Sequence, residues 1–407
     1  MNQPYAVSEP TCSSDRPVAA IDTVRSTASR RLFIDNLRWT MILLVVGMHA
    51  AVTYSPFGNW YYRDGAATDR LSALAFGTFQ AFLQAFFMSL LFAVSGYFAC
   101  ASLLRKGPAS FLRDRAIRLG VPVLLYMLAI GPATECFVAR SWRMPPSSSF
   151  GREWFRHIVD GRVLGESGPL WFCVALLIFS AVYAVLQGVT PPAGHRTTGE
   201  GEGDPTLAAM LAFVLAMAAG TFAIRLIVPS GKAVFNLQLG DFPQYVLMFA
   251  AGVHARRTGW LDRLSASSGR RWATGGVLLG GLAWVLIIGL GGALQGKTQA
   301  YGGGWTWQAA AKALWESWVC VSFSLRLFTL YRARFDTQGR LTRWLSANAF
   351  AVYVFHPPIL IAVTRLLHVW SMPSLVKFAT AWVLGGAASL IFAALVARRT
   401  PVLRAFL

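Results

Sequence analysis

Charged residues are scarce in this chain, and acidic ones are the scarcest. Only 14% of the 407 residues are charged, with 18 Asp and Glu against 37 Lys and Arg, whereas 55% are hydrophobic. A soluble domain needs more polar surface than this composition supplies, so the chain is not an ordinary soluble globular protein. We expect lipid to solvate much of its surface.

Cysteine is also rare, and the cysteines are not spaced in the pairs that disulfide frameworks or metal sites use. The five residues stand apart, most of them inside apolar runs where cysteine behaves as a small hydrophobe: Cys12, Cys100, Cys136, Cys173 and Cys320. The sequence therefore predicts neither a disulfide framework nor a metal site.

The net charge of +19 raises the question of nucleic-acid binding. Such binding needs basic residues gathered on a water-facing domain, but no polar stretch here exceeds roughly 30 residues. Instead, Lys and Arg fall mainly in the segments that share one side if each apolar run crosses a membrane once. This is the positive-inside pattern, so we expect membrane lipids and no nucleic acid as partners.

Apolar runs near the ~20 residues that cross a ~30 Å hydrocarbon core recur along the chain. The predicted spans are 34–54, 71–103, 118–139, 168–190, 207–229, 243–255, 272–294, 308–331, 344–369 and 374–397. An even number places both termini in the cytoplasm, together with the segments 104–117, 191–206 and 256–271. The predicted fold is an all-α polytopic membrane protein of about ten transmembrane helices in the cytoplasmic (inner) membrane.

The remaining segments complete the domain organisation. Residues 1–31 are rich in Ser, Thr, Pro and Arg and lack a secretory signal, which predicts a disordered cytoplasmic tail. Residues 32–400 form the predicted transmembrane domain, and 401–407 a short cytoplasmic tail. Residues 150–162 predict an amphipathic helix in the outer interface, since Trp154 begins an apolar stripe on one face.

The first span carries three ionisable residues, which are costly inside a bilayer and therefore candidates for function. Arg38 and His49 are eleven residues apart, so they share one helix face, with a rise of roughly 16 Å between them. Asp35 lies one turn before Arg38 and can pair with it. This arrangement suits an anionic donor whose phosphates bind Arg38 while its reactive end reaches His49 as general base. The alternative is that all three only anchor or pack the helix.

The basic segment RKGPASFLRDRAIRLGVP extends the expected donor site, and Arg115 and Arg118 within it are candidate phosphate ligands. Its alternative role is topological anchoring. Ser95, in the preceding span, is a candidate catalytic hydroxyl, although close helix packing at the neighbouring Gly96 is the favoured explanation.

A second histidine lies at a similar depth. His356 in NAFAVYVFHPPILI is thirteen residues past Arg343, which places it roughly 19 Å into the membrane, close to the depth of His49. Pro357 and Pro358 must bend this helix or free backbone carbonyls. Three aromatic residues are candidates for the acceptor site: Trp171, Phe172 and Tyr353.

Five stretches together resemble the membrane-bound acyltransferase family three, and within it the branch that decorates periplasmic glucans. They are IDNLRWTMILLVVGMHA, SGYF with the following FLRDRAIRLGVP, GPLWF, FAAGVHARRTGWLDRL and NAFAVYVFHPPIL. The resemblance implies a ten-helix fold and transfer of an acyl group, acetyl, succinyl or similar, from cytoplasmic acyl-coenzyme A to a hydroxyl of a sugar, glycan or related acceptor. It also implies functional roles for Arg38, His49 and His356.

A competing function is a membrane transporter or flippase without covalent chemistry, because intramembrane His, Asp and Arg also form ion paths. Two observations favour acyl transfer. The basic segment after the second span suits an anionic donor, and the sequence shows no pair of broken helices in corresponding halves, which many transporters have. The oxyanion donor stays open among Ser95, Tyr353 and His356.

Overall fold

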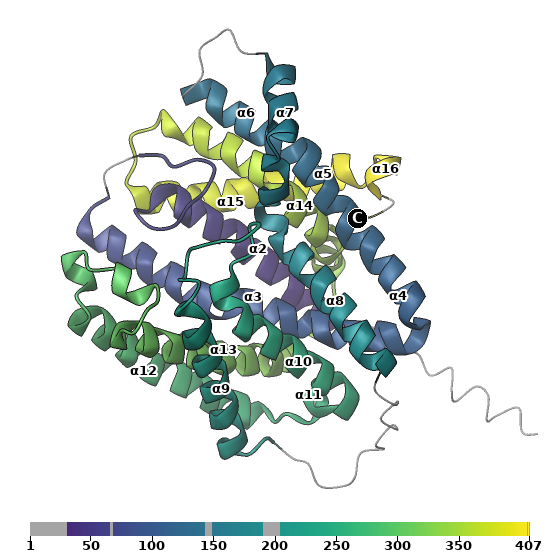
Figure 1. Cartoon of the computed structure of the whole chain (residues 1–407), viewed down its shortest axis with the longest axis vertical. Coiled ribbons are helices and arrows are strands. Elements are labelled where there is room, and N and C mark those ends of the chain that lie inside the picture. The colour runs from purple at the N-terminus through teal and green to yellow at the C-terminus, as the bar shows by residue number, and fades with distance from the viewer. Residues whose placement is uncertain (1–30, 66–67, 143–148, 190–203, 405, 407) are drawn as a thin grey trace, which may run out of the picture.

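The computed structural model describes residues 31–65, 68–142, 149–189, 204–404 and 406 of the chain (Figure 1). The predicted tail, apart from Arg31, lies outside the described residues, as does most of the 191–206 segment. Arg31 itself pairs with Asp262. The described structure therefore begins one residue before the predicted transmembrane domain.

The described chain is built from helices. Their bounds are α2 Leu32–Tyr54, α3 Arg70–Lys106, α4 Pro108–Arg115, α5 Val121–Leu125, α6 Gly131–Trp142, α7 Phe150–Val159, α8 Trp171–Val189, α9 Leu207–Arg225, α10 Phe242–Thr258, α11 Trp260–Arg263, α12 Ala266–Leu290, α13 Trp307–Arg334, α14 Arg340–His368, α15 Ser374–Phe392 and α16 Pro401–Arg404. Short π-helical turns, Ala116–Gly120 and Tyr126–Ile130, join α4, α5 and α6 into one long element.

Each of the ten predicted spans coincides with one of these helices or with the joined α4 to α6 element. Eight helices within the described residues are long and apolar enough to cross a membrane. The two others are α10, which has only 17 residues, and α13, whose 28 residues carry several charges. The all-α polytopic class is confirmed.

The basic segment after α3 is helical. Gly107, at φ +75°, separates α3 from α4 and lets the chain reverse there, a backbone conformation that favours glycine. The third predicted span therefore begins as a helix at Pro108, ten residues earlier than expected. Residues 150–162 contain the predicted amphipathic helix as α7.

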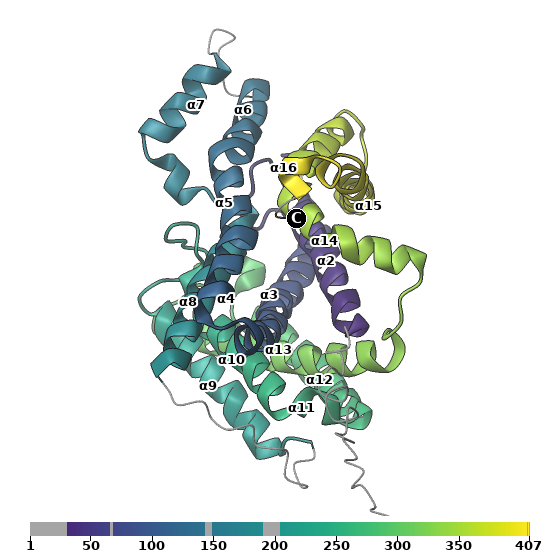
Figure 2. The same cartoon turned by 90° about the vertical axis from the view of Figure 1, so that its right-hand side faces the viewer.

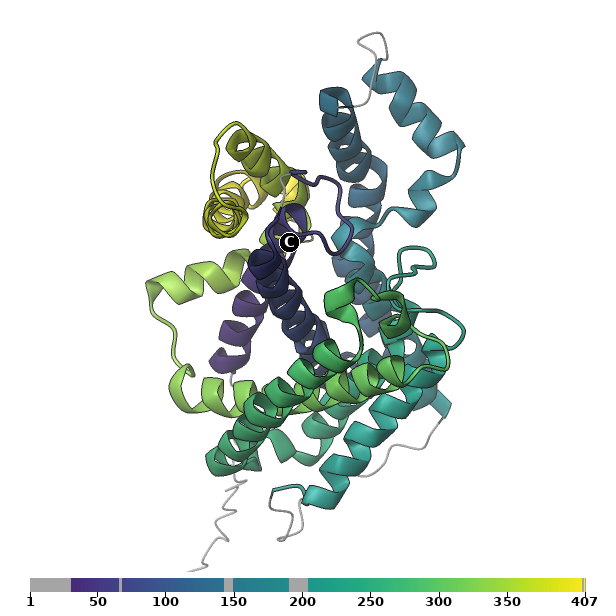
Figure 3. The ribbon, with the colours of Figure 1, turned by 90° about the vertical axis from the view of Figure 1, so that its left-hand side faces the viewer.

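Helices α2 and α3 lie at the centre of the bundle. Helix α2 packs on α14, α15, α3 and α13, and α3 packs closely on α10. A side chain at Gly252 would collide with the Ala93 carbonyl, so glycine is what lets α10 approach α3 this closely. Figure 2 shows α4 to α7 on one flank of this centre and α14 and α15 on the other, and Figure 3 shows the same separation from the opposite side.

Candidate active site

Three nearly parallel rings meet where α2, α14 and the segment 55–65 come together. The centroid of the His49 ring lies 3.7 Å from that of Trp60 and 5.3 Å from that of His356, with interplanar angles of 17° and 19°. Trp60 and His356 are 6.3 Å apart at 7°. The two histidines that the sequence placed at similar depths are therefore neighbours, in contact with an indole that the sequence did not single out.

The two prolines of α14 explain the orientation of His356. Pro357 has no N–H to donate to the carbonyl of Tyr353 one turn earlier. That carbonyl instead accepts a hydrogen bond from His356 Nδ1 at 2.9 Å. Because a carbonyl only accepts, Nδ1 carries the proton and the lone pair is on Nε2. His356 is fully buried, and its Nε2 has no hydrogen-bond partner among the described residues.

Tyr353 connects α14 to the GPLWF segment. Its hydroxyl donates to the carbonyl of Pro169. Gly168, at φ +50°, lies against the ring of Tyr126, where any side chain would collide. Asn236 Nδ2 donates to the Gly168 carbonyl at 2.7 Å and holds the segment from the other side. The Tyr353 hydroxyl is thus already committed to a hydrogen bond between α14 and the GPLWF segment.

The segment 55–65, which carries Trp60, is fixed by a buried carboxylate. Asp64, with a side chain only 1% exposed, accepts from His368 Nδ1 at 2.7 Å and from Lys377 Nζ at 2.9 Å. The Tyr62 hydroxyl donates to it at 3.2 Å. Burial alone would raise the pKa of Asp64, but the hydrogen bonds from His368 and Lys377 hold it below its ordinary value.

At the opposite end of α2, Arg38 lies within electrostatic reach of the basic segment that follows α3. Arg38 Nη1 lies 3.5 Å from Asp35 Oδ1, and the Arg38 side chain is 47% exposed whereas that of Asp35 is buried. The charges of Arg38 and Arg118 both act on the Arg115 guanidinium. Cations that repel one another in this way make the cluster a favourable place for an anion.

The other predicted site residues are more dispersed. Gln80 of α3 donates to Ser55 at the end of α2, and Ser95 lies ~23 Å further along α3 by helical rise. His49 lies only ~9 Å from Ser55, so Ser95 is nearer to the level of Arg38 than to that of His49.

The aromatic residues of GPLWF lie behind Tyr353. Phe172 is edge-on to the Tyr353 ring at 6.3 Å, and Trp171 lies 5.6 Å from the ring of Tyr245. Phe172 is also edge-on to Phe92 at 4.7 Å. Tyr353 therefore lies between Phe172 and His356, whereas Trp171 packs on Tyr245 and Phe172.

A buried ionic network that the sequence reasoning did not name joins α9, α10 and α13. Arg225, 2% exposed, donates to Glu316 at 2.6 Å and to Asp241 at 2.5 Å. Lys312 Nζ lies 3.5 Å from the same glutamate. Arg225 and Glu316 stand inside predicted spans, so the rule that flagged His49 would also have flagged them. Their charges are paired with one another, and removing one partner would leave a buried charge uncompensated.

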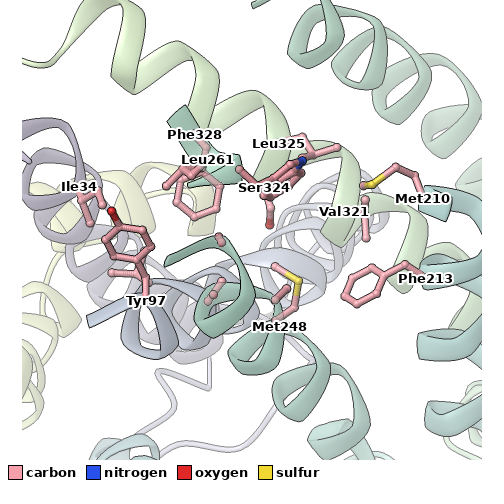
Figure 4. A pocket seen from close by; sticks show the side chains of 16 residues that line it. Ile34, Tyr97, Met210, Phe213, Met248, Leu261, Val321, Ser324, Leu325 and Phe328 are labelled. Atoms are coloured by element: carbon pink, nitrogen blue, oxygen red, sulfur yellow. The ribbon is translucent and has the colours of Figure 1, made fainter. Parts of the chain in front are cut away.

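Figure 4 shows an apolar cavity of about 60 Å³ between α2, α3, α10 and α13. Its walls are almost entirely hydrocarbon, including Ile34, Met248 and Phe328, with Tyr97 and Ser324 at its edge. None of the three stacked rings lines it. An apolar cavity of this size stays dry and reflects imperfect helix packing.

The family model described as "Acyltransferase domain" matches residues 31–398, nearly the whole described chain. This chain belongs to the acyltransferase-3 family. Together with its eight long apolar helices, this makes it a multi-pass membrane protein of that family.

Individual relatives match only part of this chain. It is 31% identical over 97 residues to the glucans biosynthesis protein C of Salmonella typhi and 30% identical over 97 residues to that of Escherichia coli K12. Each match covers 24% of this chain and 24% of the relative, so it spans about a quarter of the relatives' length. No solved structure matches the chain significantly.

Proposed function

We propose that this acyltransferase moves an acyl group, acetyl, succinyl or similar, from cytoplasmic acyl-coenzyme A to a hydroxyl of a sugar, glycan or related acceptor, in the inner membrane. The observation that carries the proposal is the pair of stacked imidazoles, His49 and His356, at one end of α2, with the arginine cluster around Arg38 at the other. The name of the relatives, glucans biosynthesis protein C, favours a glycan acceptor.

The donor binds at the arginine end. Arg38, with Arg115 and Arg118, receives the phosphates of the coenzyme, because guanidinium groups bind phosphate with two parallel hydrogen bonds. Asp35 holds Arg38 in place. The roughly 16 Å between Arg38 and His49 is then spanned by the extended arm of the coenzyme, with the thioester beside the histidines.

The chemistry needs one base and one oxyanion donor. His49 takes the proton of the acceptor hydroxyl, the hydroxyl oxygen bonds to the acyl carbon, the carbon–sulfur bond breaks, and the coenzyme leaves as a thiol with that proton. The lone pair on His356 Nε2 accepts a hydrogen bond that orients the hydroxyl.

Trp60 is the best candidate for the oxyanion donor. The Tyr353 hydroxyl and the His356 N–H already donate to backbone carbonyls, and Ser95 lies toward the other end of α2. The indole N–H of Trp60 is buried and has no hydrogen-bond partner in the described part of the chain, next to His49. A fixed donor in such a water-poor site stabilises a developing negative charge strongly.

The test is label transfer by purified protein in detergent. Acetyl- and succinyl-coenzyme A carrying a labelled acyl group are incubated with the protein and a soluble glucan, and both free thiol and labelled glucan are measured. We expect both products to appear together with wild type and to fall to background with His49→Ala. Coenzyme release and labelling that stay equal in wild type and His49→Ala would contradict the proposal.

A further inference from the structure

A second polar cluster lies away from the histidine pair, at the junction of α6, α7 and the turn that follows them. His157 Nε2 is 3.0 Å from Glu166 Oε2, and His157 Nδ1 is 3.8 Å from Glu135 Oε2. One ligand atom from each residue can be chosen so that all three lie within 4.8 Å of one another. The three residues come from three separate segments, so their convergence is a property of the fold.

The cluster has unused ligand capacity. His157 is only 5% exposed, yet its Nε2 has no hydrogen-bond partner in the described chain. The same holds for Glu166 Oε2, because the two atoms are close but not aligned for a hydrogen bond. Buried polar atoms are nearly always satisfied, so two adjacent exceptions point to a missing ligand.

We infer that Glu135, His157 and Glu166 bind one divalent transition-metal cation. Zn²⁺ binds imidazole nitrogen and carboxylate oxygen at 2.0–2.2 Å, so tetrahedral ligand atoms lie roughly 3.4 Å apart. With one ligand atom from each residue, the present separations are at most 4.8 Å, so none needs to shorten by more than about 1.4 Å to reach this value. One imidazole with two carboxylates favours Zn²⁺ or Mn²⁺ over Mg²⁺ and Ca²⁺, which prefer oxygen ligands alone.

A cavity gives a cation access to the cluster, and a cation bound there would link neighbouring segments. Glu135 and His157 line a cavity of about 400 Å³ that also has Glu153 and Asp160 on its walls. A bound cation would fasten α7 to α6 and to the segment that leads into GPLWF. Both Glu135 and Glu166 also act electrostatically on Tyr61, the residue after Trp60, so the site adjoins the loop over the histidines.

The experiment measures metal binding directly and is independent of acyl transfer. Protein purified through a tag without histidine is stripped with a chelator and titrated with Zn²⁺ in competition with a chromophoric indicator. We expect one Zn²⁺ per chain, with affinity reduced at least ~10-fold in His157→Gln and in Glu166→Gln. Co²⁺ should give visible absorption bands in wild type that His157→Gln removes.

Two controls keep the result specific. Glu153→Gln alters a carboxylate on the same cavity outside the cluster, and His254→Gln alters an exposed histidine on α10. Both should bind like wild type. If Glu166→Gln does not elute as a single folded species, Glu135→Gln takes its place. Wild type that takes up no Zn²⁺, or cluster variants that bind as wild type does, would overturn the inference.

Discussion

Asp64 gives the sharpest test of how the site is held together. Its carboxylate is the shared acceptor for His368, Lys377 and Tyr62, and it fixes the loop that places Trp60 on His49. Asp64→Asn keeps the shape of the side chain but removes the charge. Lys377, itself 5% exposed, is then left as a buried cation without its counter-charge.

Breaking a buried ion pair in this way typically costs about 3–5 kcal/mol. The His368 side chain is 40% exposed and can regain water, so we take the low end, about 3 kcal/mol. Each 1.4 kcal/mol is tenfold, so the closed loop should lose about 100-fold in population relative to open forms. Wild type should show the same loosening below about pH 4, because a lowered carboxyl pKa gives stability that is lost as pH falls through it.

The assay is hydrogen exchange of the peptide covering 55–69, read by mass spectrometry, together with the rate of label transfer. The Asp64 amide donates to the Thr53 carbonyl at 2.9 Å, so it reports opening of the loop directly. Asp69→Asn is the matched control, since Asp69 caps α3 by accepting hydrogen bonds from the Ser72 amide and the Ser72 hydroxyl. Equal exchange in 55–69 for wild type and Asp64→Asn would refute the reasoning.

Substitutions at five further residues test the proposed roles. Arg38→Ala should weaken coenzyme binding, measured by calorimetry, much more than Arg38→Lys, because lysine keeps the charge but loses the bidentate grip on phosphate. His49→Ala should lower the transfer rate ~10²–10⁴-fold with binding near wild type, and it should abolish the fall in rate at acidic pH, whereas His356→Ala should keep that fall. Trp60→Phe should preserve the stack but lower the rate ~10²–10³-fold if the indole N–H serves the oxyanion, as rate measurements at saturating donor can check. Glu316→Gln should lower stability by about 3 kcal/mol in denaturant unfolding, because it takes one counter-charge from buried Arg225.

The helices of this protein were largely predictable because a bilayer demands long apolar runs. All ten predicted spans are helical, and α2 begins and ends within two residues of its prediction. The largest difference is at the third span. There the basic residues between Pro108 and Arg118 suggested a loop, but once Gly107 has turned the chain, nothing prevents them from continuing as a helix.

Depth within the membrane was the most useful site information in the sequence. Counting helical rise from a basic residue at the same membrane face placed His49 and His356 at similar levels, and their rings lie 5.3 Å apart. Helical rise gives the depth of a residue along its own helix, but it does not tell which helices pack against each other. The contact of Trp60 with His49 could not be predicted, because it depends on a loop fixed by partners 304 and 313 positions away from Asp64.

Polar groups inside the spans fall into two physical classes, and hydrogen bonding separates them. Arg225 is buried but meets two carboxylates and a backbone carbonyl, so its charge is compensated and each of its guanidinium nitrogens already has a partner. His356 is equally buried, but only one of its two nitrogens is bonded, and the other lies beside a second imidazole. Leaving such an atom unsatisfied costs about 1–3 kcal/mol, a cost that packing alone does not explain. A ligand hydroxyl at His356 Nε2 would remove this cost, which is why the histidine pair, and not the larger ionic network, is where we place the chemistry.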